Sequence, residues 1–151
     1  MLGSIGTNLW VSALVVVVFF TLVLGISVLR GRHDTVDTAW GLAFAVVAIA
    51  SLLLSAGQRD LGASIAWRRY LITGLTIVWG VRLAVHLHLR NGPRGEDPRY
   101  QRILASAKGS PLAHAVRKVY LPQAAFAWVI SLPLQVGQYS TGRDPVSLTL
   151  Y

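Results

Sequence analysis

The residues of this chain that could do chemistry lie within one apolar segment and directly after it. Arg82 interrupts the apolar stretch, Arg90 closes it, and the sequence Glu96-Asp97-Pro98-Arg99-Tyr100 follows after a short turn. Ionisable groups within a membrane are costly and therefore mark candidate functional sites. Arginines and glycine backbone amides can donate hydrogen bonds to phosphates, and neighbouring carboxylates can orient the arginines. The candidate phosphate-binding residues are Arg90, Glu96, Asp97, Arg99 and Tyr100.

A second set of polar residues could meet this cluster from another helix. Asp34 and Asp37 are three residues apart and lie close to one helical face, and Arg82 and His86 share a face four residues apart. A pairing of Asp37 with Arg82 or with His86 is geometrically possible, and it would lower the cost of both charges. We take Asp37 and Arg82 as candidate catalytic residues. A purely structural pair, or an arginine whose head reaches the lipid headgroups, explains the same spacing.

The cluster also has a simpler interpretation. The stretch 91–95, Asn-Gly-Pro-Arg-Gly, is typical of a turn, so the residues after it could form the solvated start of a loop. The spacing matches neither of the usual glycine-rich phosphate-binding motifs. His86 and His88 are two residues apart and face different sides of a helix, whereas helical zinc sites use a spacing of four. The chain has no cysteine, and we predict no metal site.

Four long apolar runs must position these residues. Only 13% of the 151 residues are charged, against about 25% in typical soluble domains. The runs cover residues 9–29, 38–57, 70–88 and 119–137, and each matches the roughly 20 residues that span a hydrocarbon core. The first run shows no polar face, which predicts a lipid-facing packing helix. We therefore predict an all-α, multi-pass membrane bundle of four transmembrane helices in one domain, residues 1–151, in the cell membrane.

The distribution of basic residues predicts the orientation. The first and third loops carry nine Lys and Arg residues, and the second loop and the C-terminal tail carry four. The positive-inside rule then places the N-terminus outside and the long third loop in the cytoplasm. This topology, with attraction to anionic lipids, accounts for the formal net charge of +8 without a nucleic-acid partner.

Several segments, in their order and spacing, resemble the steroid 5-alpha-reductase-like membrane proteins, specifically the bacterial DUF1295 branch. The similar segments are Asp37-Thr38-Ala39-Trp40-Gly41, Trp79-Gly80-Val81-Arg82-Leu83-Ala84 with His86 and Arg90, Glu96-Asp97-Pro98-Arg99-Tyr100, Gln123 with Trp128, and Ser131-Leu132-Pro133. The resemblance covers the chain from about Asp34 to Pro133.

The resemblance implies an integral membrane reductase of about seven helices that takes hydride from NADPH. The reduced bond is a carbon–carbon double bond conjugated to a carbonyl, in a steroid or another lipid-like small molecule. An acid polarises the carbonyl oxygen while hydride reaches the β carbon. In the steroid branch a Glu at the second helix and a Tyr on the third supply that acid, and the nearest counterparts here are Asp37 and Trp79.

By the resemblance, the chain corresponds to the first four helices, and the Arg-His-Pro-Asn-Tyr-like segment associated with NADPH in the C-terminal half does not occur in it. We therefore expect no catalysis by this chain alone, and a C-terminal half or other partner helices to complete the cofactor site. The alternative is a noncatalytic small membrane protein that acts through helix–helix partners. A weaker alternative is an ion or proton path along Asp37, Arg82 and His86.

Overall fold

The chain folds into long helices that run side by side, as predicted. The computed structural model describes residues 4–56, 63–92 and 95–140, and within these ranges all regular structure is helical. The elements in chain order are α1 (Ile5–Arg30), α2 (Thr35–Ser55), α3 (Ala63–Asn91), α4 (Pro98–Ala105), α5 (Pro111–Ala115), the π-helical turn η1 (Val116–Tyr120), α6 (Leu121–Ile130) and α7 (Leu132–Tyr139).

Four helical stretches are long and apolar enough to cross a membrane, which confirms the predicted class. They are Ile5–Arg30, Thr35–Ser55, Ala66–Asn91 and Pro111–Tyr139. The runs predicted at 9–29 and 70–88 lie inside longer helices, because polar residues at the ends extend the helix beyond the apolar core. The run predicted at 119–137 lies inside the span Pro111–Tyr139. The run predicted at 38–57 begins three residues earlier, at Thr35, and its last residue lies outside the described residues.

The fourth span is a chain of short helices rather than one uniform helix. The π-helical turn η1 ends where the Leu121 N–H donates to the Val116 carbonyl, five residues back. Pro122 follows immediately and has no N–H to continue the ordinary ladder, which favours such a local change of register. A second break at Ser131 separates α6 from α7, which has Pro133 in its first turn. The two prolines thus lie at breaks that the surrounding helices accommodate.

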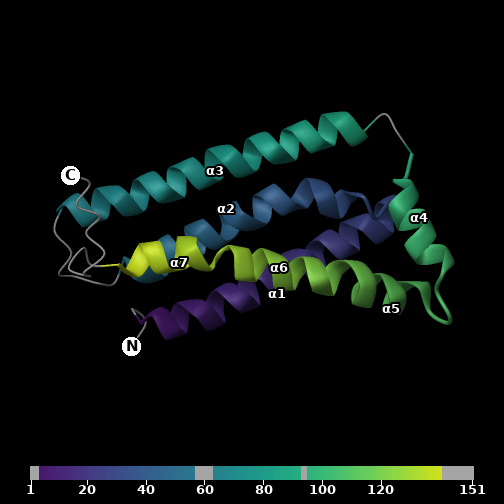
Figure 1. The fold of residues 1–151 in the computed structure, drawn as a ribbon, viewed down its shortest axis with the longest axis horizontal. Helices are drawn as coiled ribbons and strands as arrows, with labels where there is room; N and C mark the ends of the chain where they lie inside the picture. Colours follow the sequence, from purple (N-terminus) through teal and green to yellow (C-terminus); the bar gives the residue numbers. More distant parts are fainter. Residues whose placement is uncertain (1–3, 57–62, 93–94, 141–151) are drawn as a thin grey trace, which may run out of the picture.

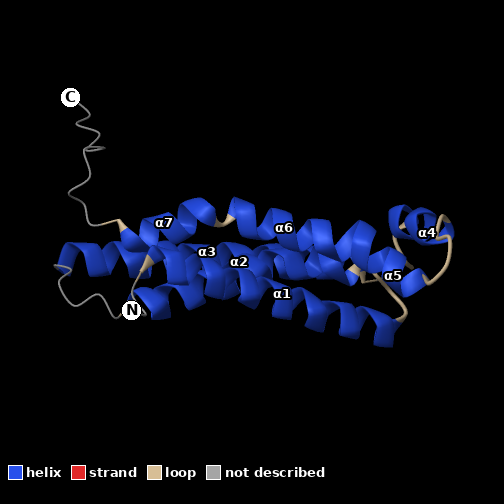
Figure 2. Cartoon of the chain, turned by 90° about the horizontal axis from the view of Figure 1, so that it is seen from below, coloured by secondary structure: helices blue, strands red, loops and turns tan. Residues whose placement is uncertain are grey.

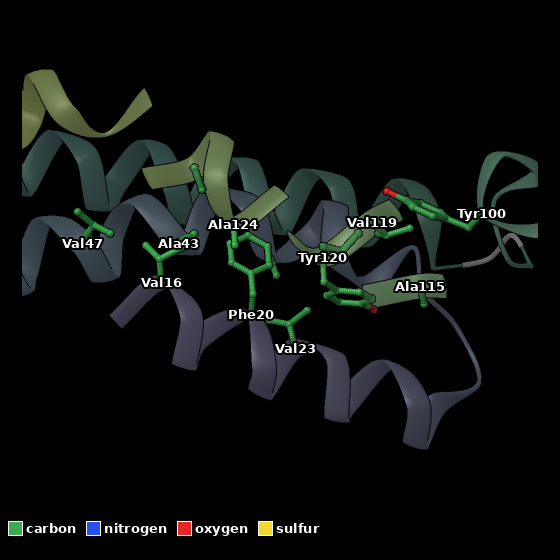
Figure 3. Packing of buried hydrophobic residues seen from close by; sticks show 13 residues of the cluster. Val16, Phe20, Val23, Ala43, Val47, Tyr100, Ala115, Val119, Tyr120 and Ala124 are labelled. Carbon is green, nitrogen blue, oxygen red and sulfur yellow. The ribbon is translucent and has the colours of Figure 1, made fainter. Parts of the chain in front are cut away.

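Helices α1 and α2 and the fourth span enclose the core, and α3 lies at the edge. Figure 1 shows α3 along one side of α2, with α1 and the α5–α7 segment on the other side. Figure 2 shows α4 and α5 gathered at one end of the bundle, which we call the α4 end. The core combines aromatic and small side chains from these elements (Figure 3): Val16, Phe20, Val23, Val36, Ala39, Ala43, Val47, Tyr100, Ala115, Val119, Tyr120, Ala124 and Ala127.

The backbones of helices α2 and α3 come into contact at two glycines. A methyl group built on Gly41 would overlap the carbonyl oxygen of Gly80, and one built on Gly80 would overlap that of Gly41. Small residues allow such backbone contact between membrane helices, where dispersion forces drive association. The pair therefore fixes which side of α3 faces the bundle.

The face of α1 that meets the fourth span is polar in its first turns. Gln135 Oε1 accepts hydrogen bonds from Asn8 Nδ2 at 2.9 Å and from Ser12 Oγ at 2.7 Å. Trp128 Nε1 donates to Ser12 Oγ at 3.1 Å, and Gln135 Nε2 donates to Ser131 Oγ at 2.9 Å. Asn8, Ser12 and Gln135 are fully buried. The prediction that the first run has no polar face is therefore wrong.

Candidate functional site

The start of α2 receives a carboxylate from the loop that precedes α4. Glu96 accepts hydrogen bonds from the backbone N–H of His33 at 2.6 Å and of Asp34 at 2.9 Å. Backbone N–H groups at a helix start have no partner within the helix, and the dipole there favours negative charge. Glu96 therefore caps α2 from a distant part of the sequence and holds the two loops of the α4 end together.

Arg32 makes a second link between these two loops. Its Nη2 lies 2.6 Å from Asp34 Oδ2 and its Nε lies 3.2 Å from Asp34 Oδ1. Arg32 also donates to the carbonyl oxygens of Asn91 at 3.1 Å and of Gly95 at 3.4 Å. Asp34 is only 5% exposed, so its charge is matched by a two-point contact of the kind that carboxylates and arginines form best. The hydrogen bond to Asp34 raises the pKa of Arg32.

Asp37, in the first turn of α2, is the acceptor at the centre of the site. Its Oδ1 accepts the hydroxyl hydrogen of Tyr100 at 2.6 Å, and its Oδ2 lies 3.0 Å from Arg99 Nη2. Asp97 caps α4 by accepting the backbone N–H of Arg99 at 2.8 Å, and it also holds the Arg99 guanidinium at 2.9 Å. Helix α4 thus positions both donors against Asp37.

The environment keeps the Tyr100 phenol neutral. The side chain belongs to the buried core, and its burial raises the pKa of Tyr100, to which the hydrogen bond to Asp37 adds. The hydrogen bond from Arg99 lowers the pKa of Asp97, and the pKa of Arg99 is raised mainly by the same contact. The site therefore combines an ionised Asp97–Arg99 pair with a neutral hydrogen-bond donor that points at a carboxylate.

The predicted cluster is brought together only in part. Glu96, Asp97, Arg99 and Tyr100 lie around the first turn of α2, in agreement with the prediction that these residues and Asp37 meet at one end of the bundle. Arg90 lies beside them at the end of α3, where Nε donates to Asn91 Oδ1 at 3.3 Å. It lines a cavity of about 450 Å³ that is also bounded by Asp34, Asn91, Gly95, Glu96, Asp97 and Pro98.

The pairing of Asp37 with Arg82 or His86, which the spacing makes possible, does not form in the structure. Both oxygens of Asp37 are taken by residues of α4, whereas Arg82 and His86 are exposed on α3. The physical reason is the Gly41–Gly80 contact, which turns Gly80 toward α2. Arg82 is two residues further on, or about 200° around the helix, and so faces away.

Two further residues of the site were not predicted. His33 Nδ1 lies 3.1 Å from the Tyr120 hydroxyl oxygen, and the two rings meet edge to face with centroids 5.9 Å apart. This contact joins the α1–α2 turn to the π-helical turn η1. In the sequence, Tyr120 looks like one of the aromatic residues that lie at a membrane interface. Only the structure, in which Tyr120 is 4% exposed, shows that it is a buried residue of the site. Among the described residues, no group of three or more His, Asp or Glu side chains could hold a metal ion.

Comparison with curated proteins and with solved structures gives no match. A family model described as "Protein of unknown function (DUF1295)" matches residues 23–150, which includes α2, α3 and every element of the site. The four membrane-spanning helices identify an integral membrane protein. The chain therefore belongs to the DUF1295 family of proteins of unknown function.

Proposed function

We propose that this chain forms the N-terminal membrane part of an NADPH-dependent reductase. The reductase would reduce carbon–carbon double bonds conjugated to a carbonyl, in steroids or other lipid-like molecules. The observation that carries the proposal is the contact between Tyr100 and Asp37, in which a neutral phenol donates to a carboxylate over 2.6 Å. A donor of this kind, poised beside a cationic side chain, suits a carbonyl oxygen on which negative charge develops.

In this mechanism Tyr100 changes its hydrogen-bond partner from Asp37 to the carbonyl oxygen of the substrate. Arg99 keeps Asp37 paired during the exchange, because it holds the other carboxylate oxygen at 3.0 Å. NADPH, when bound, supplies the hydride that forms the new bond at the β carbon. Tyr100 stabilises the resulting enolate oxygen, and the α carbon then takes up a proton to complete the saturated product.

The groups at the cavity beside Arg90 suit part of such a dinucleotide. Arg90 makes one side-chain hydrogen bond, to Asn91, so most of its donors are available to a phosphate. Glu96 and Asp97 line the same cavity with carboxylate oxygens, which can accept from ribose hydroxyls. The cavity of about 450 Å³ would hold only a portion of the cofactor. Other helices must therefore contribute the remaining contacts.

The test measures NADPH binding to the full chain in lipid nanodiscs by nicotinamide fluorescence. Because the cavity takes only a portion of the cofactor, we expect weak but saturable binding that Arg90→Gln weakens at least tenfold. Arg102→Gln, a matched loss of charge at an exposed residue of α4, should leave it unchanged. Tyr100→Phe should bind NADPH normally and lose reduction of a steroid enone when the complete reductase is assembled. Absence of saturable binding, or equal effects of the two arginine variants, would refute the cofactor assignment.

The outward position of Arg82 favours the alternative, a noncatalytic protein that works through partner helices. Under that alternative, Asp37→Asn and Tyr100→Phe change only the amount of folded protein, and NADPH does not bind. Measurement of protein abundance beside NADPH affinity in the same variants separates the two functions. Turnover of an enone by the purified chain alone would contradict our expectation that further helices are required.

A further inference from the structure

The outer face of α3 carries a positive charge at a depth where a membrane offers no water. Twenty residues separate Arg69 from Arg90, and Arg82 is the only Asp, Glu, Lys or Arg among them. Twenty helical residues match the thickness of the hydrocarbon core. Along the helix axis, at a rise of 1.5 Å per residue, Arg82 lies about 4 Å from the midpoint of this stretch and about 12 Å from Arg90.

The described part of the chain holds no counter-charge for Arg82. Its four carboxylates all lie at the α4 end and already accept hydrogen bonds there: Asp34, Asp37, Glu96 and Asp97. Asp60 and Asp144 lie outside the described residues. An axial distance of about 12 Å to Arg90 also exceeds the reach of an arginine side chain, so the head of Arg82 cannot reach the headgroup level alone.

Arg82 lies within a continuous apolar surface on the outer side of α3 that contains a hollow. Exposed apolar side chains run along the same side of α3: Leu71, Leu75, Val78, Val85 and Leu89. A hollow of about 630 Å³ opens among Arg82, Leu83, Val85, His86 and Leu89. His86 is exposed one turn beyond Arg82 and provides a second polar group at the hollow.

A second copy of this chain does not suit this face. Two copies in one membrane share the same orientation, so a symmetric contact through α3 would place the two Arg82 side chains at the same depth. The like charges would then repel each other in a medium of low dielectric constant. A free fatty acid is also a poor match, because its carboxylate belongs at the headgroup level with its tail pointing inward.

We propose that the outer face of α3 binds a transmembrane helix that presents an Asp or Glu side chain at the depth of Arg82. The carboxylate enters the hollow and pairs with the guanidinium, and His86 lies within one turn of it. The apolar side chains on either side bury the rest of the partner helix. This inference does not depend on the reductase proposal, because the charge of Arg82 requires a partner whether or not NADPH binds.

The test uses a designed leucine–alanine transmembrane peptide with one Glu at the depth of Arg82. Energy transfer from the full chain, labelled by a C-terminal fluorescent tag, to the labelled peptide reports association in phosphatidylcholine vesicles. We expect the Glu peptide to bind about threefold to twentyfold more strongly than a Gln peptide, the range measured for polar contacts between membrane helices. Arg82→Gln should abolish the difference, and Arg90→Gln should keep it.

A charge reversal keeps the test decisive if the neutral variant folds poorly. Arg82→Glu should prefer a peptide with Lys in place of Glu. Equal binding of the Glu and Gln peptides, or a preference that persists in Arg82→Gln, would overturn the proposal. Selective displacement of the Glu peptide by oleate would assign the surface to a free carboxylate instead. NADPH takes no part in this assay, so its outcome is separate from that of the cofactor test.

Discussion

Replacing Gly41 by alanine should destabilise the bundle, because this glycine brings the backbones of α2 and α3 into contact. A methyl group at residue 41 would lie 3.1 Å from the carbonyl carbon of Gly80 and 3.2 Å from its Cα, and would overlap the carbonyl oxygen. Ordinary contacts of such a carbon begin at 3.4 Å. The obstacles are backbone atoms and cannot rotate away, so the helices themselves must separate.

To admit the methyl group, α2 and α3 must move apart by about 1 Å, and this distance determines how much stability Gly41→Ala loses. A radial gap of 0.5–1 Å forfeits roughly a quarter to a half of the dispersion energy of the atoms on either side. Overpacking of a close interface typically costs about 1–3 kcal/mol, and we expect Gly41→Ala to fall in this range. Gly41→Ala and Gly80→Ala disturb the same contact, so the double variant should lose less than the sum of the two single losses.

Reversible unfolding in mixed detergent micelles, followed by circular dichroism, measures these free energies. Gly74→Ala is the matched control, because Gly74 lies on α3 with Gly80 and nothing lies within 4 Å of its added methyl. Alanine is the better helix former by about 1 kcal/mol, so the control should be neutral or stabilising. A loss of less than about 0.5 kcal/mol for Gly41→Ala, or an equal effect of the control, would refute the packing argument.

Three further predictions concern the polar contacts. Glu96→Gln should lower the free energy of unfolding by about 1–3 kcal/mol, because an amide leaves His33 or Asp34 without an acceptor; an effect no larger than that of Arg102→Gln in the same micelles would contradict this. Gln135→Leu removes the acceptor of Asn8 and Ser12 and should cost about 1–2 kcal/mol by the same measurement, whereas unchanged stability would mean that the two side chains find other partners. The pKa of Tyr100 is raised in the folded state, so its stabilising effect is complete below the ordinary pKa of about 10 and is lost as pH rises further. Unfolding at pH 9 and pH 11 should therefore show a smaller alkaline loss in Tyr100→Phe than in the natural chain, and equal losses would exclude this role for Tyr100.

The membrane spans could be predicted because length and apolar composition alone determine them. The bounds of the helices could not, since polar residues such as Asn8 and Arg90 continue a helix past its apolar part. The interruptions of the fourth span were signalled by Pro122 and Pro133. Their form, a π-helical turn and a break at Ser131, depends on packing against the rest of the bundle.

The sequence indicates which residues belong to the candidate site better than it indicates which of them contact each other. Helical periodicity shows that Arg82 and His86 share a face, but on a helix that is apolar all round it does not show where that face points. Gly41 and Gly80 indicate which side of α3 faces the bundle, since a close contact between two helices needs small residues. The partner of Asp37 lies on α4, and the docking of α4 depends on the distant contacts of Arg32 and Glu96.

The buried amide contact between α1 and the fourth span has a consequence for the synthesis of the protein. Asn8 leaves the ribosome 127 residues before Gln135, which accepts its hydrogen bond. Throughout that interval the first helix carries polar groups whose final partner does not yet exist. The contact can therefore form only when the fourth span enters the membrane, so the packing of α1 against that span follows the insertion of all four spans. A chain interrupted before Gln135 would leave the amide of Asn8 and the hydroxyl of Ser12 without this acceptor in the membrane.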